Sequence, residues 1–532
     1  MAAGIGRLSR ETVAAAKKFS LDARLSDDFV FPVYSETKRV IPTQATRWNL
    51  GTDRLKMIMA ATFLVWLALS VVLVYHPGGH VYLDEFFHFL YARGAAGDLS
   101  RFVDVWQRPG ASAIFVGPAQ LGFRAARFAA LAVSVLTVIV IYQLGRLVSR
   151  QFACLVVLFA LFQPYFVLES FAVMTEVPFA LCLGLGLIFW LKKRPLAAAL
   201  VLSLLPLFRP EGFVLLPVLA FFFLFSRDAP GLRRKALCLL SLGLGTAVWV
   251  ALGWYESGDP LFLFRNNPYG DAPLGLYGSG GLHWQFLAFM ECAGPVIFCL
   301  TFIGTVRLLR MRRPLLPVLF LSFLIFHVTL YYFGLWGAMW MPRYFVALLS
   351  VTAVLAAAGL EGVAQWAGRA GGSLAGGALL KRTGRTILIL VCVAGGYFAV
   401  RLGVHVFVDY RGDMYAALGD SVEWLKEYAE TNEVPAIYAT HPYYSAYYEY
   451  ERNGSEIRSY EEIFEGRPEA GSLVLWDATC AGGKDRSMGS SPVADPAKYD
   501  KIICFDAPPP SFVPGLEHFR VEVYRRIGQA RP

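Results

Sequence analysis

Long apolar runs recur along this chain of 532 residues and constrain its fold more than any other feature. About twenty apolar residues suffice for a helix to span the hydrocarbon core of a bilayer. The runs lie near residues 57–75, 126–147, 152–168, 177–191, 196–208, 213–226, 236–255, 291–309, 315–333, 344–366 and 386–408. The sequence therefore predicts a polytopic α-helical membrane protein with about 11 transmembrane helices. Only 17% of the residues are charged, against about a quarter in soluble domains, which excludes a soluble enzyme or a disordered chain.

Two of these runs, 196–208 and 213–226, are short for full crossings. They are separated by Arg209-Pro210-Glu211-Gly212, and a re-entrant hairpin broken at this turn is an alternative to two spans. The two interpretations differ by two in the number of spans, so the sidedness of the remaining connections is the same in both.

Basic residues indicate the sidedness, because they collect in cytoplasmic loops. Alternate connections contain Arg146, Arg150, Lys192, Lys193, Arg194, Arg227, Arg233, Arg234, Lys235, Arg307, Arg310, Arg312 and Arg313. We therefore expect a cytoplasmic N-terminus and an external C-terminal region, and the net charge of +9 reflects topology rather than nucleic-acid binding. No cleavable signal peptide is visible, so the first span is expected to act as a signal anchor.

The chain divides into three predicted parts. Residues 1–56 form a cytoplasmic tail, and residues 57–408 form the transmembrane domain with a long first external loop at 76–125. Residues 409–532 combine a helical pattern at 413–430 with strand-like runs at 434–439, 472–476 and 500–505, which is typical of a small α/β domain.

The C-terminal part is rich in tyrosine. Its tyrosines include Tyr438, Tyr443, Tyr444, Tyr447, Tyr448 and Tyr450. They are compatible with a face that binds sugars or lipid headgroups or with an interfacial belt resting on the membrane. Cys480 and Cys504 are the only cysteines of this part, and an oxidising compartment would allow them to pair, although spacing alone does not establish the bond.

Two adjacent carboxylates, Asp84 and Glu85, follow the first span. Ionisable residues at the membrane face suggest a functional site, and a carboxylate there can accept a proton from a hydroxyl nucleophile. The alternative is structural, because Asp84 is a good N-cap and Glu85 suits a first helical turn. A further acidic residue, Glu176, lies in a predicted external turn, where Thr175 could cap the next helix.

Few cations lie on the predicted external side. Arg343 opens a span after Met341-Pro342, and Arg209 and Arg108 lie in external connections. Arginine grips phosphate in a bidentate manner, so these three are candidates for a lipid phosphate. A snorkelling anchor is the alternative for Arg343.

These motifs resemble the GT-C superfamily of integral membrane glycosyltransferases. The carrying segments are Tyr82-Leu83-Asp84-Glu85-Phe86-Phe87-His88, Gly117 to Arg127 with Tyr142-Gln143-Leu144-Gly145-Arg146, Met174-Thr175-Glu176-Val177-Pro178-Phe179, Phe208 to Gly212, and Pro342-Arg343-Tyr344. They are similar to segments of dolichol-phosphate-sugar-dependent transferases and of RgtA/B/C/D-like and aminoarabinose-transferase-like bacterial members.

The resemblance implies a hexosyl- or pentosyltransferase that uses a polyprenyl-phosphate-linked donor at the outer membrane face. Asp84 would act as the base and Glu85 would support its loop. Glu176 and His88 would bind or support the acceptor, which could be a lipid, a glycan or a protein. A divalent metal serves some relatives, but we do not predict a required metal or other cofactor here. The expected location is the inner (plasma) membrane of a bacterium.

Three other functions are compatible with such a chain. A transporter or flippase would place ionisable residues near span centres and repeat its broken helices. A ligase of lipid-linked glycans would share the substrates but lack the Asp-Glu pair of the first loop. A non-catalytic scaffold would use the C-terminal domain to bind a partner.

Overall fold

The fold was analysed in a computed structural model, which describes part of the chain. The described residues are 52–75, 83–148, 153–226, 231–268, 274, 278–370, 386, 390, 393, 397, 414–444, 448, 457–459, 468–477, 493, 495–507 and 519–527. Most of the predicted tail 1–56 and of the last apolar run, 386–408, lies outside them. The first helix begins at Thr52, a few residues before the predicted boundary.

Five helical segments of the described chain are long and apolar enough to cross a membrane. They are α2 (Thr52–Tyr75), α6 (Phe123–Val148), α12 (Leu232–Ser257), α16 (Leu315–Phe333) and the segment Pro342–Trp366, which comprises η2 (Pro342–Leu348) and most of α17 (Leu349–Ala370). A sixth arises if α14 (Trp284–Ala293) and α15 (Pro295–Arg310), which meet at an angle of 110°, form one broken span. The protein is thus a multi-pass membrane protein.

The remaining apolar runs are shorter or interrupted, so the structure does not establish the predicted count of about 11 spans. Run 152–168 consists of α7 (Ala153–Leu161) and α8 (Pro164–Glu169). The next runs give α9 (Glu176–Leu191), α10 (Pro195–Leu202), η1 (Leu205–Leu207) and α11 (Glu211–Leu224). Helices α8, α10 and α15 all start with proline, which suits a first helical turn but cannot continue a preceding helix.

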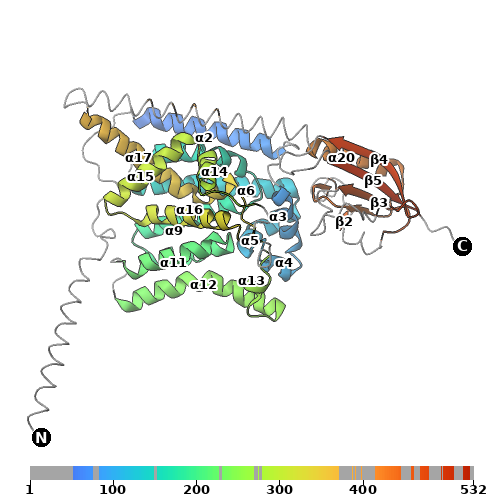
Figure 1. The fold of residues 1–532 in the computed structure, drawn as a ribbon, viewed down its shortest axis with the longest axis horizontal. Coiled ribbons are helices and arrows are strands. Elements are labelled where there is room, and N and C mark those ends of the chain that lie inside the picture. The colour runs from blue at the N-terminus through green and yellow to red at the C-terminus, as the bar shows by residue number, and fades with distance from the viewer. Residues whose placement is uncertain are drawn as a thin grey trace, which may run out of the picture.

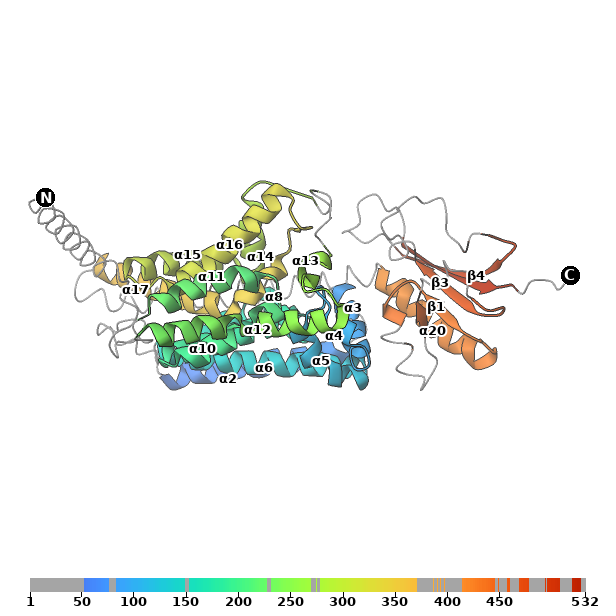
Figure 2. The same ribbon diagram turned by 90° about the horizontal axis from the view of Figure 1, so that it is seen from below.

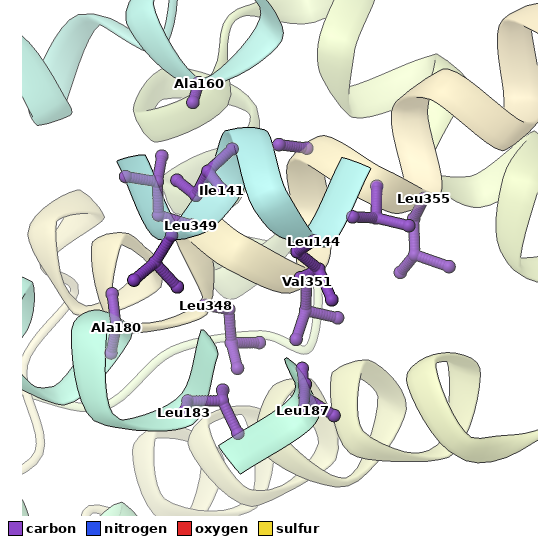
Figure 3. Close-up of a cluster of buried hydrophobic side chains, with 14 of the residues drawn as sticks. Ile141, Leu144, Ala160, Ala180, Leu183, Leu187, Leu348, Leu349, Val351 and Leu355 are labelled. Carbon is purple, nitrogen blue, oxygen red and sulfur yellow. The ribbon is translucent and has the colours of Figure 1, made fainter. Parts of the chain in front are cut away.

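The helices run side by side in a long bundle, as Figures 1 and 2 show. Helices α15 and α17 approach so closely that a Cβ atom at Gly304 would collide with the backbone of Leu355. Aliphatic side chains from α6, α9 and the η2–α17 segment fill the centre of the bundle, including Ile141, Leu183 and Leu348 (Figure 3). This apolar packing fixes the ends of the helices on which the polar groups described below are placed.

The predicted first loop folds into three short helices at one end of the bundle. They are α3 (Leu83–Gly94), α4 (Leu99–Val103) and α5 (Pro109–Gln120). Helix α13 (Phe262–Arg265) lies at the same end of the bundle (Figures 1 and 2).

The C-terminal part pairs α20 (Met414–Thr431) with a five-stranded sheet in the order β2-β1-β3-β5-β4. The strands are β1 (Ile437–Ala439), β2 (Ile457–Ser459), β3 (Leu473–Asp477), β4 (Tyr499–Ala507) and β5 (Phe519–Arg526). Strands β2, β1 and β3 are parallel, whereas β5 is antiparallel to both β3 and β4. The helix and three of the strands fall in the segments where the sequence predicts them, but β2 and β5 were not predicted.

The tyrosines of this part lie mainly in its interior. Tyr438, Tyr443, Tyr444 and Tyr448 are all buried, so for these four both predicted roles, a sugar-binding face and a membrane belt, are wrong. Their rings pack against other side chains. Tyr443, for example, contacts Phe86 of α3, with ring centroids 5.7 Å apart.

Tyr447, Tyr450 and Cys480 lie outside the described residues. The Cys480–Cys504 pair therefore stays a prediction, with Cys504 in β4.

Candidate active site

Asp84 lies in the first turn of α3 and forms an ion pair with Arg343 at the start of η2. Nη2 of Arg343 donates to Oδ2 of Asp84. The Asp84 side chain is 37% exposed, whereas that of Arg343 is 7% exposed. Arg343 is therefore not a snorkelling anchor, because it is buried and engaged by a carboxylate that still reaches solvent.

The pKa of Asp84 reflects two opposing effects. Burial raises it, but the Arg343 guanidinium, with smaller contributions from His88 and Arg108, holds the pKa of this carboxyl below its ordinary value. In the structure as it stands, Asp84 is thus ionised and a weak base.

Behind this pair lies a buried network of polar groups from the starts of α9 and α11 and from the interior of α16. Oε1 of Glu176, at the start of α9, lies 2.6 Å from Nη1 of Arg209 and 3.7 Å from Nε of Arg343. Arg209 also donates to Glu211, with Nη2 2.7 Å from Oε1. Oε1 of Glu211 lies 3.2 Å from Nε2 of His327. Each carboxylate thus has a cation or a histidine beside it, as buried charges require.

Local sequence explains why this network forms at the start of α11. Arg209-Pro210-Glu211-Gly212 is a turn in which arginine and glutamate lie two residues apart. A Cβ atom at Gly212 would collide with the backbone of Leu205 and Pro206. Glycine therefore lets the start of α11 pack closely against η1, and this contact holds Arg209 and Glu211 next to Glu176.

Thr175 does not make the predicted cap. Its side chain makes no capping hydrogen bond to α9. Instead its backbone N–H donates to Oε2 of Glu176 at 3.0 Å, and its hydroxyl lies 3.2 Å from Nη1 of Arg209. Thr175 thus orients the Glu176–Arg209 pair.

His88 lies one turn after Asp84 on α3, and it is buried. Its Nδ1 is 2.5 Å from Oε1 of Gln107, and Nε2 of Gln107 donates to the backbone oxygen of His88 at 3.3 Å. An amide oxygen only accepts, so Nδ1 carries the ring proton and Nε2 is the acceptor. Burial lowers the pKa of His88 to about 4, which keeps the ring neutral at neutral pH.

Arg108 lies next to Gln107 and precedes α5 in a left-handed backbone conformation, with φ of 67°. Its charge acts on both Asp84 and His88. Arg108 is therefore near the Asp84 end of the site, whereas Arg209 lies behind Glu176.

Glu85 points into a different environment from Asp84. It accepts from Nε and Nη2 of Arg127, each at 2.8 Å, and from the backbone N–H of Val173 at 3.1 Å. The side chains of Glu85 and Arg127 are both 0% exposed. Glu85 is thus a buried link between α3, α6 and the loop before α9, and it is separated from solvent.

The structure therefore brings Asp84, Glu176, Arg209 and Arg343 together, with His88 and Arg108 beside them. The sequence did not predict Glu211, His327 and Tyr344 as residues of the site. The guanidinium groups of Arg209 and Arg343 lie over the Tyr344 ring, 5.2 and 5.9 Å from its centroid. Glu169 and Arg127 were not predicted either. An ionisable residue within an apolar run is itself a signal, which would have identified His327.

No group of three or more His, Cys, Asp or Glu side chains suited to a metal ion occurs among the described residues. The carboxylates of the site are instead engaged by arginines. The arrangement can bind an anion at Arg343 and can remove a proton at Asp84.

Solved structures of one other protein share the fold of this chain. The solved structure of ArnT from Cupriavidus metallidurans bound to undecaprenyl phosphate is similar, with a TM-score of 0.54, 15% identity, and coverage of 89% of this chain and 98% of ArnT. The apo structure of the same ArnT gives a TM-score of 0.53 at 14% identity, covering 87% and 98%. At such identities the likeness shows the fold. No family model matches this chain, and no curated protein does.

Proposed function

We propose that this protein is a glycosyltransferase that moves a sugar from a polyprenyl-phosphate-linked donor to a hydroxyl acceptor. The observation that carries the proposal is the Asp84–Arg343 pair, in which a half-buried base reaches solvent beside a buried cation. The ArnT structure with the same fold holds undecaprenyl phosphate, which supports a lipid phosphate as part of the donor.

Arg343 is the proposed ligand of the donor phosphate. Arginine hydrogen-bonds to phosphate in a charge-assisted manner, and we infer that Arg343 exchanges its bond to Asp84 for a bond to the donor phosphate. Arg108 lies close enough to act on Asp84 and supplies further positive charge beside it. Arg209 contacts Glu176 and Glu211, so we assign it the supporting role of holding the network in place.

This exchange would also activate the base. Arg343 lowers the pKa of Asp84, so a phosphate that draws Arg343 away raises that pKa and makes Asp84 a stronger base. Binding of the donor thus makes Asp84 a stronger base, and proton transfer to Asp84 is favoured only when the donor is bound.

The proposed reaction is a single displacement with inversion. The acceptor oxygen forms a bond to the anomeric carbon, and the bond from that carbon to the phosphate oxygen breaks. The acceptor proton passes to Asp84, and the bonding electrons leave with polyprenyl phosphate. The leaving group is already a stable anion, so no second general acid is needed, and Arg343 stabilises its charge.

Glu176, His88 and Glu85 would act as positioning residues. Glu176 holds Arg209 and lies near Arg343. His88 holds Gln107, which is next to Arg108. Glu85 fixes α3 to Arg127, which sets the direction of Asp84.

The outer face of the membrane is the proposed location of the reaction. Glu176 begins α9, and Lys192, Lys193 and Arg194 follow its end. A helix of 16 residues separates them by roughly 24 Å. Basic residues mark the cytoplasmic side, which supports an outer-face position for Glu176 and its partners, together with the C-terminal domain that contacts Phe86.

Turnover of defined donors tests the proposal. Purified protein in lipid is given undecaprenyl phosphate carrying one of several labelled pentoses or hexoses, with a cell-envelope extract as acceptor, and release of undecaprenyl phosphate is measured. Asp84→Asn should reduce transfer by about 10²–10⁴-fold, which is what a general base contributes.

The matched control is Asp98→Asn in the same loop. Asp98 caps α4 through Ser100, asparagine caps a helix equally well, and transfer should be unchanged. A wild-type protein that releases no undecaprenyl phosphate from any donor, or an Asp84→Asn variant with normal transfer, contradicts the proposal.

A further inference from the structure

Glu169 is a buried carboxyl group for which the mechanism above has no use. It ends α8, and it is only 1% exposed. Neither of its carboxyl oxygens has a hydrogen-bond partner among the described residues. Buried polar groups are nearly always hydrogen-bonded, so a carboxyl group without any bond needs an explanation.

The charges closest to Glu169 are those of the candidate site. Glu176, Arg343 and Arg209 act on it more strongly than the other charged groups that influence it. Both arginines are nevertheless bound to other carboxylates, Arg343 to Asp84 and Arg209 to Glu176 and Glu211. Glu169 is therefore buried within reach of the charges of the site, but it makes no hydrogen bond to any of them.

A second buried carboxylate shows what a structural role looks like in this protein. Glu361 of α17 is 3% exposed, and its two oxygens are engaged by Arg307 at 2.7 Å and by Gln365 at 3.1 Å. A carboxylate kept for stability has its partners within the fold. Glu169 has none among the described residues, and a partner from outside the chain would satisfy it.

The protonation state of Glu169 narrows the chemistry of that partner. Burial, and then the neighbouring Glu176 charge, raise the pKa of Glu169 well above its ordinary value. A neutral carboxyl group donates one hydrogen bond and accepts others. It thus fits hydroxyl groups, each of which also donates and accepts, better than it fits a phosphate.

We propose that Glu169 is a sugar-binding residue whose carboxyl group hydrogen-bonds hydroxyls of the donor sugar. The inference rests on the proposed transferase function. The sugar of the donor is attached to the phosphate that Arg343 would bind, and Arg343 is one of the charges that act most strongly on Glu169. Glu169 would then fix the orientation of the sugar ring and contribute to the choice of sugar.

Glu169→Met tests this role, with Glu169→Gln as the conservative variant. Methionine removes both polar atoms at similar volume, so KM for the donor that the wild type uses should rise about 10-fold, as expected for a lost hydrogen bond. Glutamine also donates and accepts and should restore most of the donor affinity. Binding of undecaprenyl phosphate without a sugar should be unchanged in both variants.

Thermal stability separates this role from a structural one. Glu169→Met should melt at the wild-type temperature or above it, because it removes a buried group without partners. Glu361→Met is the matched control: it leaves Arg307 without its carboxylate, so the melting temperature should fall while donor KM is unchanged.

Several outcomes overturn the inference. Unchanged donor KM in Glu169→Met overturns it while leaving the transferase function standing, provided that Asp84→Asn is inactive. A rise in acceptor KM alone overturns the assignment to the donor sugar. If the wild type turns over no donor, the transferase function fails and the inference fails with it.

Discussion

Asp84 and Glu85 are neighbours in the chain, and each of them pairs with an arginine, but the two ion pairs differ in every other respect. The Glu85–Arg127 pair is fully buried, with two bonds of 2.8 Å and a further bond from Val173. In the Asp84–Arg343 pair the Asp84 side chain is partly exposed, and Arg343 also lies near Glu176.

The difference follows from helix geometry. Consecutive residues of a helix point about 100° apart, so α3 directs one carboxylate toward α6 and the other toward η2. A fully buried pair, whose carboxylate accepts three hydrogen bonds, suits a structural role. A pair with an exposed member can exchange partners, and this property suits a site that must bind an anion and release a base.

Breaking the buried pair should have the largest effect on stability. Arg127→Met leaves the Glu85 charge buried and unpaired, which typically costs about 3–5 kcal/mol. Thermal unfolding in detergent should show a strongly lowered midpoint. The double variant Glu85→Met/Arg127→Met should recover most of that loss. If Arg127→Met unfolds like the wild type, the pair is not the structural link described here.

A somewhat smaller effect is expected from pH, through His88. Its pKa is about 4 in the folded protein and 6.5 in its ordinary state. The unfolded chain therefore binds a proton between these values and the folded protein does not, so stability is full above pH 6.5 and falls by about 3 kcal/mol as the pH approaches 4.

His88→Gln isolates this contribution, since Asp84 and Arg108 remain in place. Glutamine can still bond to Gln107 but does not titrate. The loss of stability between pH 6.5 and 4 should be smaller in the variant than in the wild type. Equal pH dependence in the two proteins would contradict this, because it would mean that the pKa of His88 is the same in the folded and the unfolded chain.

The smallest effect should come from Arg343→Lys, on the exposed pair. Lysine keeps the charge but loses the planar fork. The loss of one charge-assisted hydrogen bond, about 1.5–3 kcal/mol, should weaken undecaprenyl phosphate binding by roughly 10–100-fold. The same substitution at Arg124, which lies in the same region at the start of α6, serves as the control and should not change binding.

The apolar runs, the Asp-Glu motif and the alternation in the C-terminal part could all be interpreted from sequence, because each is a local pattern. The breaks within the runs were harder to predict, since Gln163-Pro164 and Gly294-Pro295 interrupt hydropathy only slightly. Partner choice could not be predicted at all. Arg127 and Arg343 are equally basic in sequence, and only packing decides that one binds Glu85 and the other Asp84.

The many tyrosines of the C-terminal part were assigned the wrong environment, also because packing decides it. Aromatic residues suit a ligand-binding face, a membrane interface or a core, and composition does not distinguish these environments. Tyr438 and Tyr444 lie in the core because their neighbours in the sheet and in α20 cover them, and that contact is set by tertiary structure.

The affinity of Asp84→Asn for undecaprenyl phosphate tests most directly whether Asp84 and the donor phosphate compete for Arg343. Removing the Asp84 charge frees Arg343, so the variant should bind undecaprenyl phosphate more tightly than the wild type, by about 10-fold or more, although it no longer transfers sugar. The measurement is a titration of purified protein with the lipid in matched micelles. Affinity that is unchanged or weaker in Asp84→Asn would contradict the exchange of partners on which the proposed mechanism depends.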